Sequence, residues 1–394
     1  MQLTYVFPIL ILLFIGLFFF GCPSPASAVI ENAPKSAFGR RDAIALGIIT
    51  AVYAVTAFIG LGDTDAPQSF HDFHSGESVT VDLGEVRSID GIMLYSGLNT
   101  GSYRIELSDD GNNFSDAGSF EQNYVALFKW NDFELDALQV PNARYIRLTA
   151  SGDVRLGELA VRCGGELFGQ CADAPELFDE QGTVPEYQSY LNSTYFDEIY
   201  HARTAYENIE GVYPYEISHP PLGKLIIAIG IELFGMTPFG WRFSGVLFGV
   251  LMLPVLYALL KRMFGSTDIC ACATAIFAFD FMHFSQTRLA TIDTYAVFFI
   301  LLMYLFMYMY ITGGRKRDLA LLGLFFGRSG PFSIRSVSSM ISFCSADAAM
   351  GASHAGWLVI RFLNGLPCIA AHAPKGKPPK RKAAVSRGLQ CEKG

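Results

Sequence analysis

The stretch TYAVFFILLMYLFMYMYITGG, residues 294–314, has no charged side chain along its whole length. A helix that crosses the hydrocarbon core of a bilayer needs about 20 mostly apolar residues, so this stretch predicts a membrane-spanning helix. Further apolar stretches of similar length occur at residues 3–21, 43–62, 243–260 and 269–286. The chain is therefore predicted to be a polytopic α-helical membrane protein.

The composition agrees with a membrane protein. Hydrophobic residues make up 51% of the 394 residues and charged residues only 17%, whereas soluble domains carry about a quarter charged residues. The formal net charge is −8. An acidic chain lacks the basic surface that binds a phosphate backbone, so we do not expect nucleic acid among its partners.

Basic residues predict the orientation of the spans, because Lys and Arg gather on the cytoplasmic side of a membrane. Three basic clusters fit this rule together, at residues 35–41, 261–262 and 315–317. They fit only if residues 222–236, a short stretch that contains Glu232, lie on the outer surface without crossing. Residues 63–240 are then expected outside the cytoplasm, in a multi-pass protein of the cell membrane.

The amino terminus leaves two interpretations open. Residues 1–41 are expected to be an N-terminal hydrophobic segment and a cytoplasmic linker, followed by a span at 42–62. Ala26-Ser27-Ala28 resembles a cleavage site for a signal peptide, but no Lys or Arg precedes the apolar run as signal peptides require. A retained helix and a cleaved signal both remain possible.

Residues 63–175 have a different character and predict a β-sandwich inserted between the spans, on the extracytoplasmic side. Short β-branched and aromatic runs occur at residues 79–83, 91–95, 103–107, 125–130 and 145–149. The sequence Asp-Asp-Gly-Asn-Asn at 109–113 is a strong turn signal. Several short strands separated by such turns are typical of a sandwich or barrel.

Two cysteines lie at the end of this predicted domain. Cys163 and Cys171 would be outside the cytoplasm, where disulfides form. They are a candidate disulfide, with two free thiols as the alternative. No Cys or Cys/His array with zinc spacing is present in the sequence, so no metal site is predicted.

The outer loop at 176–240, with its surface helices, contains the residues that suggest chemistry. Residues 195–203 include Asp197 and Glu198, and residues 218–224 read Ser-His-Pro-Pro-Leu-Gly-Lys. A carboxylate can take a proton from an attacking hydroxyl, and cations can hold a phosphate leaving group. A substrate with a lipid tail and a phosphate head suits such a site at a bilayer surface. Each piece alone has a simpler explanation: exposed acids are commonly solvated, and Lys224 could extend toward the interface.

Ionisable residues near the spans are accessory candidates. Arg242 lies at the start of one span, and Asp293 lies at the start of another. Asp280 is predicted within the span at 269–286, where an acid is functional by default unless it reaches water.

Four motifs of the predicted sandwich resemble the discoidin, or coagulation-factor C-type, family. They are Val-Asp-Leu-Gly at 81–84, Leu-Ser-Asp-Asp-Gly at 107–111, Ala-Arg-Tyr-Ile-Arg-Leu at 143–148 and Leu-Gly-Glu-Leu at 156–159. The resemblance covers residues 68–163. It implies a domain that binds carbohydrate or lipid head groups through loops at one end, or that serves as a structural module.

The outer-loop motifs and the spans resemble the protein O-mannosyltransferase family, over residues 40–62 and 190–327. The motifs are Asp197-Glu198, His-Pro-Pro-Leu-Gly-Lys at 219–224, and Arg288 followed five residues later by Asp293. The resemblance implies an inverting glycosyltransferase that moves a sugar, mannose in this family, from a polyprenyl-phosphate donor to an acceptor hydroxyl. The expected partners are that donor, a protein or glycan acceptor, and membrane lipids; no cofactor or metal is expected.

The same resemblance implies roles for particular residues. Asp197 would be the catalytic base, and Glu198 would support it or the acceptor. Arg288, His219 and Lys224 would bind the donor phosphate, with Asp280, Asp293 and Arg242 as accessory residues. The sandwich inserted before the Asp-Glu motif departs from the family pattern without deleting a motif.

The predicted glycosyltransferase core, residues 241–327, ends abruptly. An apolar run that begins at Leu319 stops at Gly327, and residues 328–394 carry ten Lys and Arg against two acids. We expect this tail to be aberrant, basic and disordered. A frameshift or truncation that leaves an inactive chain is one explanation, and a genuine cytoplasmic tail is the other.

Two alternative functions stay open. One is a membrane-anchored protein that binds carbohydrate or lipid through the discoidin-like domain. The other, a transporter, rests only on Asp280, and nothing in the sequence indicates inverted repeats.

Overall fold

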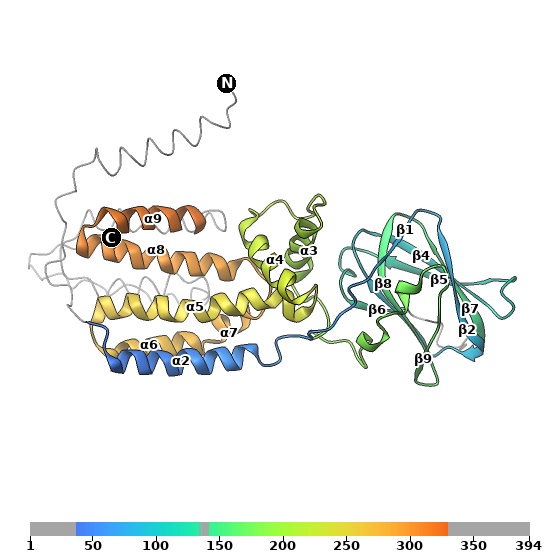
Figure 1. The fold of residues 1–394 in the computed structure, drawn as a ribbon, viewed down its shortest axis with the longest axis horizontal. Helices are drawn as coiled ribbons and strands as arrows, with labels where there is room; N and C mark the ends of the chain where they lie inside the picture. Colours follow the sequence, from blue (N-terminus) through green and yellow to red (C-terminus); the bar gives the residue numbers. More distant parts are fainter. Residues whose placement is uncertain (1–36, 134, 136–141, 330–394) are drawn as a thin grey trace, which may run out of the picture. The chain divides into compact units, whose positions relative to one another are not determined.

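The computed structural model describes residues 37–133, 135 and 142–329. Nine strands and ten helices, two of them 3₁₀ turns, make up this part of the chain (Figure 1). The predicted segment at residues 3–21 and nearly all of the basic tail, from residue 330 onward, lie outside the described residues.

The strands form two antiparallel sheets that face each other as a sandwich. Their bounds are β1 (His71–Phe73), β2 (Ser78–Ser88), β3 (Gly91–Ser96), β4 (Gly101–Ser108), β5 (Ser115–Gln122), β6 (Trp130–Phe133), β7 (Asn142–Ala150), β8 (Val154–Cys163) and β9 (Glu166–Phe168). One sheet has the order β1-β8-β3-β6 with β9 paired to β8, and the other has the order β2-β7-β4-β5. The predicted β-sandwich is therefore confirmed.

Alternating side chains explain how the sandwich forms. In β2, Val79, Val81 and Leu83 are buried while the residues between them are partly exposed, as expected of a sheet with one face toward a core. They pack with Leu94 of β3, Leu159 of β8 and other residues of both sheets in a single hydrophobic cluster. Two elements beyond the predicted end at residue 175 belong to the same unit. Leu177 enters the core, and Glu180 and Gln181 bind Glu158 of β8.

One predicted strand is wrong. Residues 125–130 have strand-like side chains, but residues 124–129 form turns, and only Trp130 begins β6. The side chain of Asn123 accepts a hydrogen bond from the Val125 N–H at 2.9 Å, and its carbonyl accepts one from the Ala126 N–H at 2.9 Å. An Asn turn therefore overrides the local β propensity.

The turn predicted at residues 109–113 is confirmed. It connects β4 to β5, and the carboxylate of Asp110 accepts hydrogen bonds from the backbone N–H groups of Asn112 and Asn113, both at 2.8 Å. Strand β5, with the polar sequence SDAGSFEQ, was not predicted because it has no apolar alternation.

The predicted spans correspond to long apolar helices. The helices are α2 (Arg40–Phe58), α3 (Glu198–Ile209), α4 (Leu222–Phe234), α5 (Pro238–Phe264), α6 (Thr267–Ala278), α7 (Phe281–Thr287), α8 (Asp293–Gly313) and α9 (Lys316–Ser329). In the described residues α2, α5 and α8 are long and apolar enough to cross a membrane, and the bent pair α6–α7 is a possible fourth span. Helix α4, with 13 residues, is too short to be one, as predicted.

The span predicted at 269–286 is broken, which corrects the position of Asp280. Helices α6 and α7 meet at an angle of 56°, and Asp280 is the N-cap of α7. Its carboxylate accepts hydrogen bonds from the N–H groups of Met282 at 3.0 Å and His283 at 3.3 Å. An acid that caps a helix start satisfies backbone donors, so Asp280 does not lie in the middle of a continuous membrane helix.

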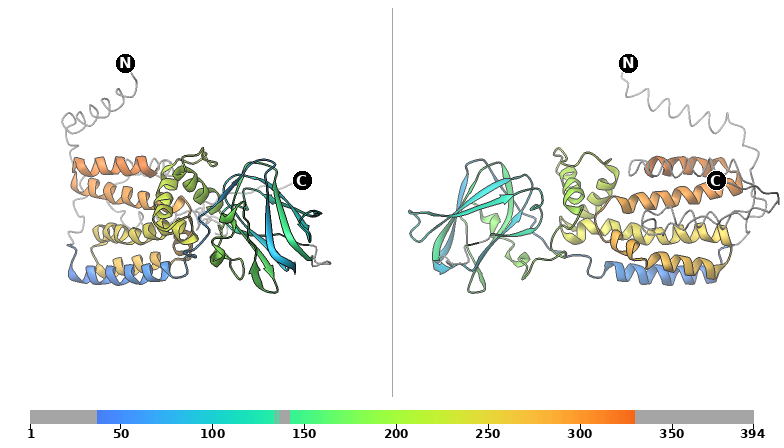
Figure 2. Two further views of the ribbon diagram at one scale, coloured as in Figure 1. Left: turned by 45° about the vertical axis from the view of Figure 1, so that its right-hand side comes forward. Right: turned by 180° about the vertical axis from the view of Figure 1, so that it is seen from behind.

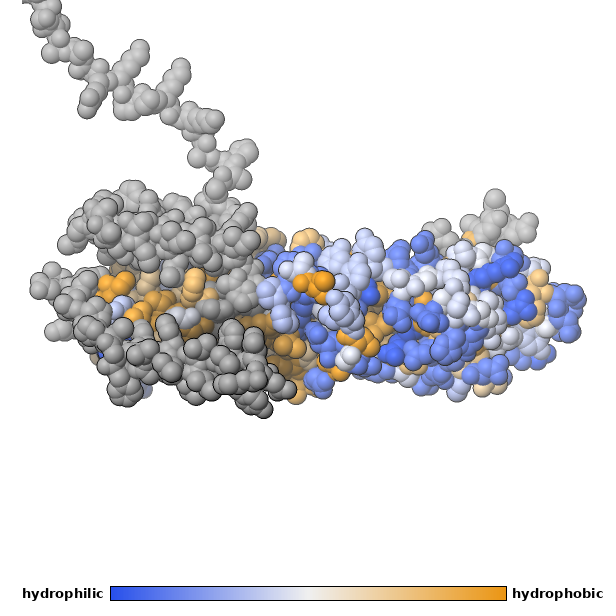
Figure 3. Space-filling view, turned by 90° about the horizontal axis from the view of Figure 1, so that it is seen from above, coloured by the Kyte–Doolittle hydropathy of each residue, from blue (hydrophilic) through white to orange (hydrophobic). Residues whose placement is uncertain are grey.

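The long helices pack side by side. Both views of Figure 2 show α2, α5, α8 and α9 with nearly parallel axes. At one end a buried ion pair joins α5 to α2, because Lys261 of α5 lies 2.9 Å from the carboxylate of Asp42 in α2, which also accepts a hydrogen bond from Tyr257. In Figure 3 the visible surface over the strands is mostly hydrophilic, whereas apolar residues show between the grey atoms over the helices. This distribution fits a chain with a lipid-embedded part and a water-exposed part.

Candidate active site

The two adjacent carboxylates predicted to be catalytic stand at the start of α3, but they have opposite environments. Asp197 occupies the N-cap position and is partly exposed, and its side chain makes no capping hydrogen bond. No described residue donates a hydrogen bond to its carboxylate. Phe196, immediately before it, has a left-handed backbone with φ of 55°, a conformation that is uncommon for a non-glycine residue. Asp197 is thus an unpaired acid at the surface.

Glu198 is fully buried and fully paired. Its Oε1 accepts hydrogen bonds from Arg242 Nε at 2.7 Å and from the Ala290 N–H at 3.0 Å. Its Oε2 accepts hydrogen bonds from Arg242 Nη2 at 2.6 Å and from the Tyr195 N–H at 2.9 Å. A carboxylate offers about four acceptor positions, and all four are used.

Arg242 is equally saturated. Beyond its two bonds to Glu198, it donates from Nη1 to the carbonyls of Leu61 at 3.0 Å and Tyr190 at 2.8 Å, and from Nη2 to that of Ser193 at 3.1 Å. These bonds use all five guanidinium N–H groups. The pair therefore joins the end of α2, the outer loop, α3, α5 and the segment before α8.

This arrangement narrows the expected role of Glu198. The sequence suggested that Glu198 supports the base or binds the acceptor. A buried carboxylate with every acceptor position occupied has no site left for an acceptor hydroxyl, so Glu198 positions the start of α3 instead. Arg242 was expected only as an accessory residue, and its pairing with Glu198, 44 positions away, was not foreseen.

Two of the three residues expected to bind phosphate are engaged elsewhere. Arg288 donates to four carbonyls at the end of α2, including those of Ala57 at 2.8 Å and Gly60 at 2.6 Å. Lys224 is buried and forms an ion pair with Glu216. Lys224 Nζ contacts the carbonyls of Glu216 and His219 and the Glu216 carboxylate. Arg288 holds the end of α2 through Nη1 and Nη2, whereas no acceptor among the described residues lies on its Nε.

The third residue, His219, is exposed. Its Nδ1 lies 3.2 Å from the carboxylate of Glu216. Burial acts to raise the pKa of Glu216, but hydrogen bonds from Lys224, Ser218 and His219 outweigh it and lower the pKa to about 2. Glu216 is therefore a carboxylate that holds both Lys224 and His219, and the sequence motifs did not include it.

A second histidine lies beside this group. His201, one turn after Asp197 on α3, packs edge-on against His219 with ring centroids 5.8 Å apart. Burial is the main cause that lowers the pKa of His201, to about 4, so the imidazole is neutral at pH 7. Its Nδ1 has no hydrogen-bond partner among the described residues.

Two other predicted groups take part in none of these contacts among the described residues. Asp293 is the exposed first residue of α8. Cys163 and Cys171 are free thiols in the structure, so the candidate disulfide is not formed there. Both cysteines pack in the sandwich core, and burial raises the pKa of each thiol. They serve as small apolar core residues.

One acidic group has a spacing that could hold a cation. Ligand atoms of Glu158, Asp179 and Glu180 lie within 4.8 Å of one another. Their oxygens already accept hydrogen bonds from the side chains of Gln181 and Ser69 and from backbone N–H groups. We assign no metal to this group.

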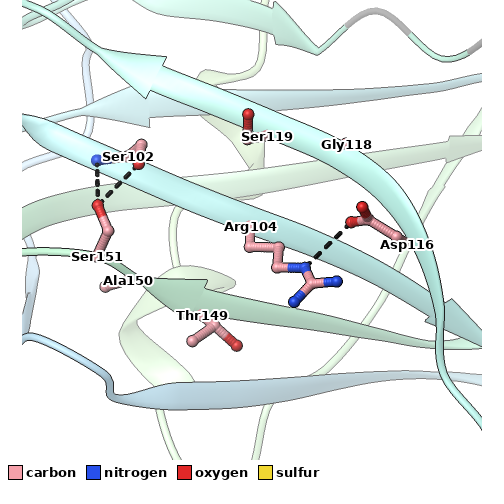
Figure 4. A pocket seen from close by; sticks show the side chains of 8 residues that line it. All are labelled: Ser102, Arg104, Asp116, Gly118, Ser119, Thr149, Ala150 and Ser151. Carbon is pink, nitrogen blue, oxygen red and sulfur yellow. Dashed lines mark hydrogen bonds and ion pairs between the residues drawn. The ribbon is translucent and has the colours of Figure 1, made fainter.

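The sandwich carries a shallow pocket of about 380 Å³ on the outer face of its four-stranded sheet (Figure 4). Hydroxyl groups and one ion pair line it: Ser102 and Ser151 bond through their side chains at 2.7 Å, and Arg104 Nε donates to Asp116 at 3.2 Å. No aromatic ring lines the pocket. It lies on strands, whereas the discoidin resemblance implied loops at one end.

Comparisons with known proteins agree with both resemblances. Residues 218–331 match the profile of the dolichyl-phosphate-mannose-protein mannosyltransferase family, and residues 55–160 match the F5/8 type C domain. Each of these two stretches is similar to its family over less than a third of the chain. The two resemblances inferred from the motifs are thereby confirmed, as is the fold class of a polytopic membrane protein with an inserted β-sandwich.

Curated relatives carry the same family name. A polyprenol-phosphate-mannose–protein mannosyltransferase of Mycobacterium tuberculosis is 36% identical over 111 residues, which is 27% of this chain and 21% of the relative. Proteins with that name from Mycolicibacterium smegmatis and Corynebacterium glutamicum are 39% and 36% identical, each over 21% of this chain and 16% of the relative. The matched part of the chain thus spans about a fifth of these relatives.

A solved structure titled "CpGH89CBM32-6 produced by Clostridium perfringens" is also similar. It is 23% identical and covers 27% of this chain and 84% of that chain, with a TM-score of 0.22.

Proposed function

We propose that this membrane protein transfers mannose from a polyprenyl-phosphate donor to a Ser or Thr hydroxyl of a protein, outside the cytoplasm. The observation that carries the proposal is the contrast between the two adjacent acids. Glu198 is saturated by Arg242, Tyr195 and Ala290, while Asp197 is partly exposed and accepts no hydrogen bond from a described residue. A general base must be free to reach the proton that it takes, and Asp197 meets that requirement.

The reaction would be a single displacement. The acceptor hydroxyl attacks the anomeric carbon, the bond from that carbon to the phosphate oxygen breaks, and polyprenyl phosphate leaves. The proton of the hydroxyl passes to Asp197. Attack from the side opposite the leaving group inverts the anomeric centre. No cofactor or metal takes part in this scheme.

His219 is the exposed candidate for the donor phosphate. Lys224 holds the loop that carries His219, through Glu216 and the His219 carbonyl, and Arg288 holds the end of α2. The carboxylate of Glu216 beside His219 holds the imidazole in place. An imidazole N–H can donate a hydrogen bond to a phosphate oxygen and stabilise the charge that develops on it.

The test is Asp197→Asn in the chain reconstituted in bilayers, with labelled polyprenyl-phosphate mannose and a Thr-containing peptide. Asn has nearly the same shape but cannot accept the proton, so transfer should fall by about 10²–10⁴-fold. Asp109→Asn, an exposed acid in the turn between β4 and β5, is the control and should keep the transfer. The proposal is contradicted if more donor restores transfer by Asp197→Asn. It is also contradicted if the unmodified chain transfers no mannose.

The pocket on the sandwich favours carbohydrate binding as a second proposed function. Its serine and threonine hydroxyls and the Arg104–Asp116 pair offer donors and acceptors that match sugar hydroxyls. Calorimetric titration with mannose oligosaccharides tests it, and Ser151→Ala should weaken binding. Equal heats for the unmodified chain and the variant contradict this second proposal.

A further inference from the structure

Three tyrosine rings lie together beside the candidate base. The ring of Tyr124, from the segment between β5 and β6, has its centroid 6.2 Å from that of Tyr200 in α3 and 6.3 Å from that of Tyr215. The Tyr200 and Tyr215 centroids are 6.4 Å apart, and the three planes differ by only 6–22°. Because the three centroids are nearly equidistant, the rings form a triangle rather than a row. We call Tyr124, Tyr200 and Tyr215 the tyrosine platform.

The platform is held in a fixed arrangement. Glu207 accepts a hydrogen bond from the Tyr215 N–H at 2.6 Å and another from Arg203 Nε at 2.7 Å. The guanidinium carbon of Arg203 lies 4.1 Å from the centroid of the Tyr215 ring, a cation–π contact. Arg203 and Glu207 are themselves buried. A buried ion pair therefore fixes both the backbone and the ring of Tyr215.

The rings remain accessible. Tyr215 is 47% exposed and Tyr124 is 42% exposed, although both are large and apolar. Tyr215 keeps this exposure although Arg203 contacts one face of its ring, and Tyr200 is partly exposed. Buried aromatic rings usually gain from packing, so a rigid set of three rings that is open to solvent points to a bound partner.

The position of the platform connects it to the proposed reaction. Tyr200 follows Asp197 by three residues on α3, which places the two side chains on neighbouring positions of one helix surface. Tyr215 precedes His219 by four residues in the segment that Glu216 and Lys224 hold. A molecule that lies on the platform therefore lies beside the unpaired carboxylate.

The proposed reaction identifies the class of molecule, because its acceptor is a polypeptide. Residues i and i+2 of a β-strand point to the same face and are separated by about 6.6 Å. Any two of the ring centroids are 6.2–6.4 Å apart. Two alternate side chains of an extended acceptor segment would therefore meet two of the three rings.

We propose that the tyrosine platform binds an extended segment of the acceptor polypeptide and presents its hydroxyl to Asp197. This inference rests on the proposed transfer of a sugar to protein. It gives the platform the role of binding and orienting the acceptor, while Asp197 keeps the role of base.

The test measures peptide binding separately from transfer. A fluorescein-labelled decapeptide with a central Thr is titrated against the full chain in lipid nanodiscs, and anisotropy gives Kd. Tyr200→Ala and Tyr215→Ala should each weaken binding by about 5- to 10-fold, the loss expected for one aromatic contact. Tyr215→Phe keeps the ring and should stay within about twofold.

Tyr213→Ala is the matched control. Tyr213 is 82% exposed in the same segment and makes no ring contact with the described residues, so its loss should leave Kd unchanged. Equal melting midpoints show that the variants are folded, and Tyr124→Ala replaces any variant that is not.

Outcomes for the platform and for the transferase proposal can be distinguished. If the unmodified chain transfers no sugar but the peptide binds through the tyrosines, the acceptor-binding inference is supported and the proposed transfer reaction is contradicted. The platform inference is overturned if the alanine variants bind the peptide like the unmodified chain, or if Tyr213→Ala weakens it equally. It is also overturned if mannotriose, and not the peptide, loses affinity in the alanine variants.

Discussion

Replacing either member of the Glu198–Arg242 pair tests whether this contact holds the outer loop against the helices. Both side chains are almost completely buried, with exposed fractions of 0% and 1%. In Arg242→Gln, the carboxylate of Glu198 keeps only the N–H groups of Tyr195 and Ala290, and the carbonyls of Leu61, Tyr190 and Ser193 lose their donor. In Glu198→Gln, two guanidinium donors lose a charged acceptor.

Each single substitution should lower the free energy of unfolding by about 3–5 kcal/mol, because it leaves an unpaired charge in a buried site. In the double variant no uncompensated charge remains. Its loss should therefore be about 1–3 kcal/mol smaller than the sum of the two single losses.

The measurement is denaturant unfolding of the chain in detergent, followed by tryptophan fluorescence. Arg104 and Asp116 form a control pair on the surface of the sandwich, with exposed fractions of 59% and 57%. Arg104→Gln should cost less than about 1 kcal/mol, as exposed ion pairs do. Strictly additive losses for Glu198 and Arg242, or single losses no larger than that of the control, would refute the assignment of this pair as the link between loop and helices.

Three further predictions follow from individual contacts. Arg288→Ala should lower the melting midpoint, since four carbonyls at the end of α2 lose their hydrogen-bond donor. If an excess of the polyprenyl-phosphate sugar restores transfer by this variant, that result would instead support the phosphate role that the sequence suggested. A cysteine at Asn112 in the β4–β5 turn should react with an impermeant maleimide in intact cells, and one at Arg262 should not; the reverse pattern contradicts the orientation. Burial raises the pKa of Glu158 to about 7, so its stabilising contribution is complete below the unfolded pKa of about 4.3 and is lost as the pH rises to 7. The sandwich should then melt at a lower temperature at pH 8 than at pH 5, and Glu158→Gln should flatten that dependence.

The spans and the sandwich were predictable from local patterns. A bilayer requires about 20 apolar residues in a row, and residues 243–260 and 294–314 satisfy that rule without reference to any neighbour. The turn at 109–113 is equally local, because Asp110 bonds to the backbone two and three residues ahead. The strand predicted at residues 125–130 is wrong for a reason that is also local. The turn that the side chain of Asn123 stabilises outweighs the strand propensity of the residues that follow it.

The motifs also located the candidate site, but only the tertiary structure decided which residues are free to act. Asp197 and Glu198 are adjacent and chemically alike, and nothing local distinguishes them. Arg242, from another helix, binds the carboxylate of Glu198, which is therefore not free to take a proton. Arg288 donates to backbone carbonyls at the end of α2, about 230 positions earlier in the chain. A sequence motif specifies which charged groups are present, whereas their availability depends on partners that folding brings from distant parts of the chain.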